Sequence, residues 1–313
     1  IPKNEELATY LEHSLVLSQE TAKEAFTSCI GHSIRESMYP IIEDIKVFLT
    51  YPQTMRSIMI CGPHKSGKHH LLRCIMQYLK IDTEQLLHID CAAIALGKLT
   101  ISDIMQRIDT SLDQEKSNII LFENLDALTE LPASITTMET LLRFYQRMAE
   151  SNELNLLFLA VTAMNEHFLQ LQKLFQKVYE LPDLNSRTLK EKYEFVLHFM
   201  QNEADAIGKT ISLSSSILNC FATACYPGNL QYLKQELRHA LSYAYIQSSQ
   251  QQETFITIDY QHLSDELLAS IRNVSDILPI IESITSTLQE KNHFLIPETE
   301  CIPLQKLLHS CIQ

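Results

Sequence analysis

The sequence predicts an α/β fold in which a parallel sheet carries helices on both faces, followed by a small all-α domain. The first observation is that short, largely apolar runs alternate with amphipathic stretches of helical length, which is typical of βαβ units. Continuous apolar runs indicate strands that are buried on both faces. The second observation is that helical patterns dominate after residue 182. The apolar runs span residues 56–61, 86–90, 118–122, 154–161 and 178–181.

The order of these patterns gives the domain organisation. Apolar residues at helical spacing predict a helix near residues 41–48, and further helices are predicted between the strands over 68–79, 101–112 and 138–148. Beyond residue 182, helices starting near residues 189, 213 and 230 predict a helical lid, and the alternating stretch 254–258 is a short strand or an extended linker. We therefore expect a helical lead-in, an α/β domain, the lid and a C-terminal helical extension, over residues 1–25, 26–182, 183–250 and 251–313.

Composition excludes several classes of protein. The chain has 313 residues, and its 6 glycines argue against β-sandwich, collagen-like and propeller folds, because average usage would give roughly 22. A net charge of −13 opposes the phosphates of DNA, so we expect no direct nucleic-acid binding by this segment. The longest apolar stretch, 154–164, is too short for a membrane helix, and we expect no membrane association.

The cysteines indicate a reducing compartment. There are 8, and none forms a C-x-x-C pair, which is typical of free thiols in a cytoplasmic protein, with a disulfide framework as the alternative. No zinc-binding spacing is visible, so the sequence predicts no metal site. The chain starts at Ile1 without methionine or a signal pattern, which favours a segment of a longer protein.

One segment predicts a phosphate-binding loop. It lies between a predicted strand and a predicted helix, where backbone N–H groups and the helix N-terminus can hold phosphates. In this pattern, G-x-x-x-x-G-K, the final lysine reaches the β and γ oxygens, so we expect the loop to bind ATP or ADP. An ordinary turn from strand to helix is the alternative. The segment reads Gly62-Pro63-His64-Lys65-Ser66-Gly67-Lys68.

The position after Lys68 departs from the usual pattern. A serine or threonine hydroxyl there ligates Mg²⁺, whereas this chain has His69, and imidazole is a poor ligand for a hard cation. Binding of Mg²⁺ is therefore expected to be weak or absent. The surrounding residues form a local cationic patch suited to a polyphosphate, with a solvated helix start as the alternative. The patch consists of His64, Lys65, His69, His70 and Arg73.

Two other strands end in residues that bear on hydrolysis. The run 118–122 is followed by Glu123 and Asn124, where an Asp-Glu pair would hold the metal and activate the attacking water. Glu123 can still bind a hydrated metal, but Asn124 cannot act as a base. Asp126 could replace it only if the strand end were remodelled. Thr162 ends the next run and is placed to position water near the γ-phosphate, with an ordinary strand-end threonine as the alternative.

The segment after the last predicted strand carries a family resemblance. It reads Leu-Pro-Asp-Leu-Asn-Ser-Arg-Thr-Leu-Lys-Glu-Lys over residues 181–192, and a Pro-Gly-Asn turn follows at 227–229. With Tyr51-Pro52 before the phosphate loop and the stretch 26–31, these motifs resemble the AAA+ modules of sigma-54-dependent bacterial transcription activators, in particular the LevR type. The resemblance covers about residues 26–275 and implies a P-loop NTPase sheet followed by a lid.

The family pattern also contains parts that this chain lacks. An arginine follows the Pro-Gly-Asn turn by two positions in the family and senses nucleotide from the lid, whereas this chain has Gln231, with Arg238 as a candidate replacement. The stretch before residue 181 offers Lys173 and Lys177 but no arginine finger. Between residues 90 and 118 there is no room for the glycine-rich loop with which the family grips the sigma factor.

These departures lead to one hypothesis and two alternatives. The hypothesis is a degenerate AAA+ nucleotide-binding module, a weak or inactive ATPase that acts by nucleotide-dependent or constitutive assembly and by partner binding. The first alternative is an active AAA+ ATPase that remodels a protein partner. The second is a scaffold subunit of a larger AAA-type assembly that binds no nucleotide. In each case we expect a homo- or hetero-oligomer, with a protein partner that the sequence does not identify.

Overall fold

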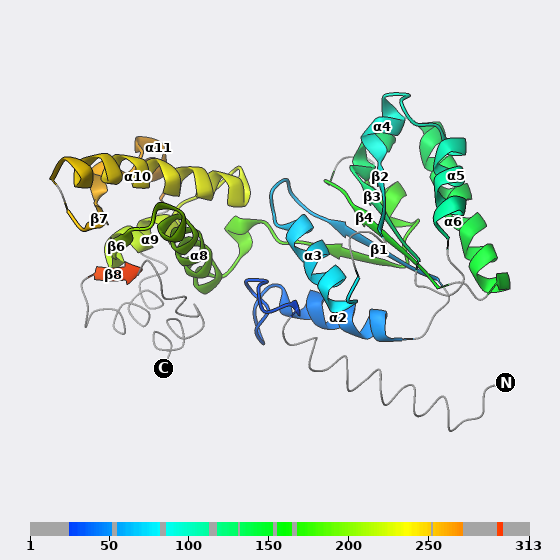
Figure 1. Ribbon diagram of the computed structural model, residues 1–313, viewed down its shortest axis with the longest axis horizontal. Coiled ribbons are helices and arrows are strands. Elements are labelled where there is room, and N and C mark those ends of the chain that lie inside the picture. Colours follow the sequence, from blue (N-terminus) through cyan, green and yellow to red (C-terminus); the bar gives the residue numbers. More distant parts are fainter. Residues whose placement is uncertain are drawn as a thin grey trace, which may run out of the picture. The chain divides into compact units, whose positions relative to one another are not determined.

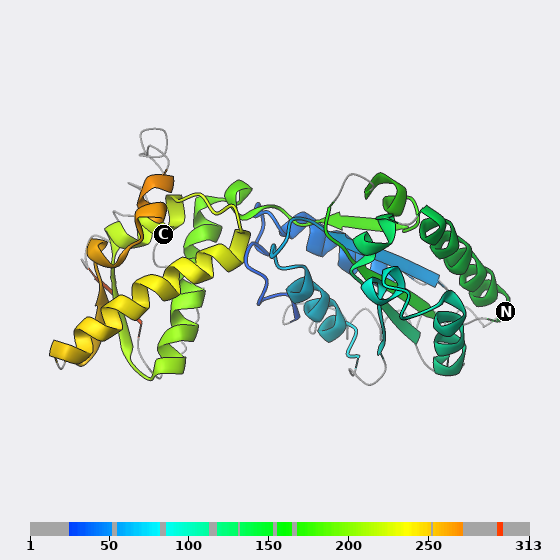
Figure 2. The same cartoon turned by 90° about the horizontal axis from the view of Figure 1, so that it is seen from above.

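The protein is described by a computed structural model that covers residues 25–51, 55–81, 86–112, 118–130, 132–152, 155–164, 168–251, 253–271 and 293–296. The chain divides into two compact units between Pro182 and Asp183 (Figure 1, Figure 2). The predicted lead-in over residues 1–25 lies outside the described residues, except for Ala25.

The first unit is built on a five-stranded parallel sheet with the order β2-β3-β4-β1-β5. Each strand coincides with one of the apolar runs, and the predicted α/β fold with a parallel sheet is confirmed. Because β1 lies between β4 and β5, the loop that follows it starts from the inside of the sheet. The strands are β1 (Met55–Cys61), β2 (Leu86–Asp90), β3 (Asn118–Glu123), β4 (Leu156–Val161) and β5 (Lys177–Glu180).

Helices cover both faces of this sheet (Figure 1). Ile58 and Ile60 of β1 are buried in a core with α2 and α3, whereas Met59 and Phe158 are buried in a second core with α5 and α6. Successive side chains of a strand point to opposite faces, so continuous apolar runs supply both cores at once. The helices of the unit are α2 (Tyr39–Thr50), α3 (Lys68–Tyr78), α4 (Cys91–Ala95), α5 (Ile101–Ser111), η2 (Leu125–Glu130), α6 (Pro132–Asn152) and α7 (Phe168–Gln172).

The second unit contains the predicted lid helices and, in addition, a small sheet. Strand β6 pairs in parallel with β7 and antiparallel with β8, so the lid is not all α. Leu213, expected at the start of a helix, lies in β6, because Ile211 and Leu213 are both buried at a spacing of two, and Ser214 caps the helix that follows. The elements are η3 (Leu184–Ser186), α8 (Leu189–Ile207), β6 (Thr210–Ser214), α9 (Ser215–Thr223), α10 (Asn229–Gln251), β7 (Phe255–Ile258), η4 (Tyr260–His262), α11 (Asp265–Ser270) and β8 (His293–Ile296).

Strand β7 lies in the segment that the sequence assigns to a C-terminal extension. Its residues Ile256 and Ile258 are buried and stand opposite Ile211 and Leu213 of β6. The alternating stretch 254–258 is therefore a strand, rather than the extended linker that was the other interpretation.

The motifs that carry the family resemblance are joined by hydrogen bonds within the second unit. The side-chain oxygen of Asn229 accepts from the backbone N–H of Leu184 at 2.9 Å. Asn185 makes two bonds to the backbone of Tyr226, at 2.8 and 3.1 Å. The start of the unit is thereby fixed to the Pro-Gly-Asn turn.

The described helices and cysteines bear on two expectations from the sequence, no membrane helix and reduced thiols. Among the helices in the described part of the chain, none is long and apolar enough to cross a membrane. The cysteines within the described ranges are free thiols. Cys301 and Cys311 lie outside those ranges.

Gly62 is the position where a side chain would disturb this fold most directly. Its φ is +141°, and an added Cβ would lie 2.8 Å from the carbonyl oxygen of Leu181. Gly97 in the same unit has a φ of +69° but open space around it. We expect Gly97→Ala to lower the free energy of unfolding by about 1 to 2 kcal/mol, the cost of a left-handed residue with a side chain.

Gly62→Ala should cost clearly more, because backbone atoms at the clash site cannot move aside as a flexible side chain would. Urea denaturation followed by circular dichroism measures both variants against wild type. Equal losses for the two alanines would contradict the close approach of Gly62 and Leu181.

Candidate functional site

The predicted site residues of the first unit gather at the carboxyl edge of the sheet. In the order β3-β4-β1, three neighbouring parallel strands end side by side, and their ends carry Glu123, Thr162 and the loop from Gly62 to Gly67. Ligands of open parallel sheets bind outside the carboxyl ends of the strands. The structure thus brings together residues that are about 100 positions apart in the chain.

The loop between β1 and α3 has the backbone of a phosphate cradle. Gly62, Lys65 and Gly67 have positive φ values of 141°, 58° and 102°. Gly67 is the N-cap of α3 and has no side chain that could bond the first N–H groups of the helix, which have no partner within the helix either. The hydroxyl of Ser66 is buried and has no hydrogen-bond partner among the described residues. These donors are available to an anion.

Lys68 is buried at the start of α3. Its Nζ donates to the carbonyl oxygens of Gly62 and Pro63 at 2.9 and 2.7 Å. Burial lowers the pKa of the Lys68 ammonium, and the Asp126 carboxylate opposes part of this shift. A buried cation that is held by neutral carbonyls gains most from an anionic partner.

Glu123 is engaged by two histidines. The Nε2 atom of His69 lies 3.2 Å from one carboxylate oxygen, and that of His88 lies 2.8 Å from the other. His69 therefore stands beside the residue that the sequence predicts to hold a hydrated metal. His88 was not singled out in the sequence, since a lone histidine in a strand carries no motif.

Asn124 is also held by a neighbouring strand end. Its φ is 53°, and its Nδ2 donates to Oδ1 of Asp90 at 2.9 Å. The same Asp90 oxygen accepts from the backbone N–H of Ala92 and caps α4. The sequence offered one signal for Asp90, its place at the end of an apolar run.

Thr162 and Asp126 form a pair at the end of β4. Thr162 is buried, and its hydroxyl donates to Oδ1 of Asp126 at 3.2 Å. The backbone N–H of Ala163 donates to the same oxygen at 3.1 Å. Asn124 has a left-handed conformation directly after β3, and the 3₁₀ helix η2 that follows contains Asp126.

His70 has different partners from the rest of the predicted cationic patch. Its Nε2 lies 3.0 Å from the carbonyl oxygen of Ser28 and 3.9 Å from the Sγ of Cys74. Hydrogen bonds from Cys29, His70 and Ser28 hold the pKa of the Cys74 thiol well below its usual value. His64 and Lys65, by contrast, are exposed in the loop, and Pro63 is half-buried.

The two candidate lid residues belong to α10 in the second unit. Gln231 is exposed. Arg238 is exposed as well, and its Nε donates to Glu203 of α8 at 2.7 Å. This bond ties two helices of the lid together, so Arg238 has a partner within its own unit. A contact of either residue with nucleotide stays a prediction.

Comparison with known proteins gives one curated relative and several solved structures, while no family model matches the chain. The transcriptional regulatory protein LevR of Bacillus subtilis (strain 168) is 22% identical over 281 residues, which cover 80% of this chain and 30% of LevR. The chain thus spans less than a third of that relative.

Two solved structures share the fold at low identity. NtrX from Brucella abortus in complex with ATP has a TM-score of 0.53 and 16% identity, covering 93% of this chain and 68% of that chain. A RuvB variant from Thermotoga maritima has a TM-score of 0.51 and 10% identity, covering 75% and 68%. The chain has the AAA+ P-loop fold and resembles the corresponding module of LevR-type transcription regulators.

Proposed function

We propose that this module binds ATP or ADP through residues 62–69, hydrolyses it slowly or not at all, and acts in transcription regulation in the cytoplasm by assembling with other subunits and a protein partner. The observation that carries the proposal is a contrast within one site. The phosphate cradle and Lys68 are complete, whereas the residue after Glu123 is Asn124, whose amide is bonded to Asp90.

Three features support nucleotide binding. The buried hydroxyl of Ser66 has no partner among the described residues, and the N-terminus of α3 has no side-chain cap. Lys68 is a buried cation whose Nζ, among the described residues, donates to two neutral carbonyl oxygens. NtrX, which shares the fold, was solved with ATP and with ADP. A polyphosphate would satisfy all of these groups at once.

The proposed lack of turnover follows from the groups around Glu123. An amide at Asn124 has no basic lone pair that could take a proton from water. Both oxygens of Glu123 lie within 3.2 Å of a histidine Nε2, so a metal would have to compete with His69 and His88. Loss of a single catalytic group slows hydrolysis by a P-loop enzyme by orders of magnitude. An arginine finger alone raises kcat by about 10³-fold to 10⁵-fold.

Substitution of Lys68 tests nucleotide binding. We expect Lys68→Ala to weaken ATP binding about tenfold to a hundredfold, because a hydrogen bond from a charged group contributes about 1.5 to 3 kcal/mol. Isothermal titration calorimetry measures the affinity, and light scattering on the same samples reports whether ATP changes the mass. Lys98→Ala, which removes an exposed lysine of the same unit, is the matched control.

Two outcomes would contradict the nucleotide proposal. If the Lys68 and Lys98 variants bind ATP with equal affinity, the phosphate loop is not the ATP-binding site. Absence of any heat at millimolar ATP for wild type would identify the scaffold that binds no nucleotide.

Substitution of His69 tests whether Mg²⁺ contributes to ATP binding. We expect the ATP affinity of wild type to change little when Mg²⁺ is removed with a chelator, because an imidazole stands where a hydroxyl would ligate the ion. His69→Ser restores that hydroxyl and frees one oxygen of Glu123, so its ATP affinity should depend on Mg²⁺. His69→Ala frees the same oxygen without adding a ligand and serves as the control. A strong Mg²⁺ dependence in wild type would show that His69 does not block the ion.

Asp126 favours the alternative of an active ATPase. Its carboxylate lies at the site edge, bonded to Thr162, and its charge acts on Lys68. A carboxylate in this place could accept the proton that Asn124 cannot accept. Its Oδ1 already accepts hydrogen bonds from Thr162 and Ala163, which hold the carboxylate in place at the end of β4, and this is why we favour slow hydrolysis.

Phosphate release from ATP decides between the two functions. We expect wild type to release phosphate at a rate close to that of Lys68→Ala. Turnover that requires Lys68 would overturn the proposal of an inactive ATPase. If such turnover also falls in Asp126→Asn but not in Asp109→Asn, a substitution on α5 in the same unit, Asp126 is the base of an active enzyme.

A further inference from the structure

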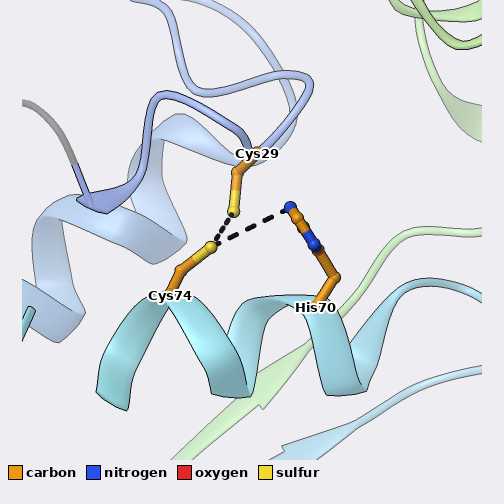
Figure 3. Close-up of side chains that lie close together, drawn as sticks. All are labelled: Cys29, His70 and Cys74. Carbon is orange, nitrogen blue, oxygen red and sulfur yellow. Dashed lines mark hydrogen bonds between the residues drawn. The ribbon is translucent and has the colours of Figure 1, made fainter. Parts of the chain in front are cut away.

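Three metal-ligating side chains converge beside the phosphate-loop helix (Figure 3). The Sγ atoms of Cys29 and Cys74 lie 3.3 Å apart, and Nε2 of His70 lies 3.9 Å from Cys74 Sγ. All three ligand atoms fall within 4.8 Å of one another. Both cysteines are buried, with 4% and 1% exposure, and His70 is half-buried. The cluster is separate from the groups around Glu123, which the proposed function uses.

We propose that Cys29, His70 and Cys74 bind a thiophilic divalent cation, with Zn²⁺ as the expected ion. Thiolate and imidazole are the ligands that Zn²⁺ prefers in proteins. Bonds of about 2.3 Å to sulfur and about 2.0 Å to nitrogen place tetrahedral ligand atoms roughly 3.5 to 3.8 Å apart. The observed separations of 3.3 and 3.9 Å lie on either side of these values, so small side-chain rotations suffice.

The backbone fixes two of the ligands in advance. His70 and Cys74 are four residues apart on α3, and residues at this spacing lie on the same face of a helix, one turn apart. Cys74 is part of the core between α3 and the sheet, so its position is set by packing. Cys29 comes from the segment before α2 and is held in the same core. An ion at this point would join that segment to α3.

Ser28 offers oxygen atoms for the remaining coordination position. Its hydroxyl lies 3.4 Å from Cys74 Sγ, and its carbonyl oxygen lies 3.0 Å from His70 Nε2. Three protein ligands leave the fourth position of a tetrahedral site to such an oxygen or to water. In the absence of the ion, the polar atoms share protons among themselves, and binding would release those protons.

A disulfide between Cys29 and Cys74 is the competing chemistry. It requires an S–S bond of about 2.05 Å and an oxidant. The two sulfurs are 3.3 Å apart, and the third member of the cluster, His70, directs a nitrogen toward one of them. A disulfide would account for the close approach of the two cysteines but not for the position of His70. A bound cation would account for the position of all three side chains.

Titration with Co²⁺, a spectroscopic substitute for Zn²⁺, tests the site on the full chain under reducing conditions. We expect one equivalent of Co²⁺ to produce the ultraviolet charge-transfer absorption of a thiolate-bound ion, and Zn²⁺ to displace it. Cys74→Ser should abolish this absorption, and His70→Ala should weaken Co²⁺ binding at least about tenfold while the thiolate signal persists at saturation. Cys225→Ser and His239→Ala, in the second unit, should bind as wild type does.

Circular dichroism of His70→Ala shows whether the variant is folded, so that a loss of Co²⁺ affinity is not caused by unfolding.

Three results would overturn the proposal. One is the absence of Co²⁺ binding by wild type with reduced thiols. Another is binding that His70→Ala and Cys74→Ser leave unchanged. The last is mass-spectrometric detection of a Cys29–Cys74 disulfide in protein prepared with Zn²⁺.

Discussion

The passage from β1 into α3 is the constraint on which the nucleotide site depends. The chain must leave the inside of a parallel sheet and enter a helix within the loop from Gly62 to Gly67, and it does so through three residues of positive φ. Only glycine adopts the +141° of Gly62 without strain, and Gly62 lies directly against Leu181 after β5. Lys65 takes a left-handed conformation despite its side chain, at a cost of about 1 to 2 kcal/mol. This strained residue lies in the loop whose backbone N–H groups form the predicted phosphate cradle.

The two departures from an active ATPase are physically linked at the carboxyl edge of the sheet. His69 removes the hydroxyl that would ligate Mg²⁺, and the same imidazole approaches Glu123, the carboxylate that would hold the hydrated ion. Asn124 then turns away into a left-handed conformation and bonds Asp90 of the adjacent strand end. The side chains at these positions, Glu123 and Asn124, are thus both held by partners from the protein itself, His69, His88 and Asp90.

The sequence predicts the parts of this structure that depend on local pattern. The apolar runs identify the central strands β1, β3 and β4 because strands buried on both faces need few polar residues. The edge strands β2 and β5 are only partly buried, but their short apolar runs were sufficient. G-x-x-x-x-G-K identifies the loop because the turn needs glycine at fixed positions. Strand β6 was missed, since a five-residue strand that ends at the capping residue Ser214 looks like the first turn of a helix. The cluster at Cys29 was missed for another reason. Cys74 is 45 residues from Cys29 in the chain, and only the packing of α3 brings the two thiols together.

Helix geometry explains why three consecutive residues of α3 serve three different environments. Successive residues of an α-helix are rotated by about 100°, so neighbours in sequence cannot face the same partner. Lys68 bonds the loop carbonyls, and His69 approaches Glu123 at the sheet edge. His70 faces Ser28 of the segment before α2 and Cys74 one turn further along α3. A run that reads as one cationic patch in the sequence is thus divided by the fold. Each of these three residues of α3 therefore has its own set of partners, and the cationic patch is not one continuous surface.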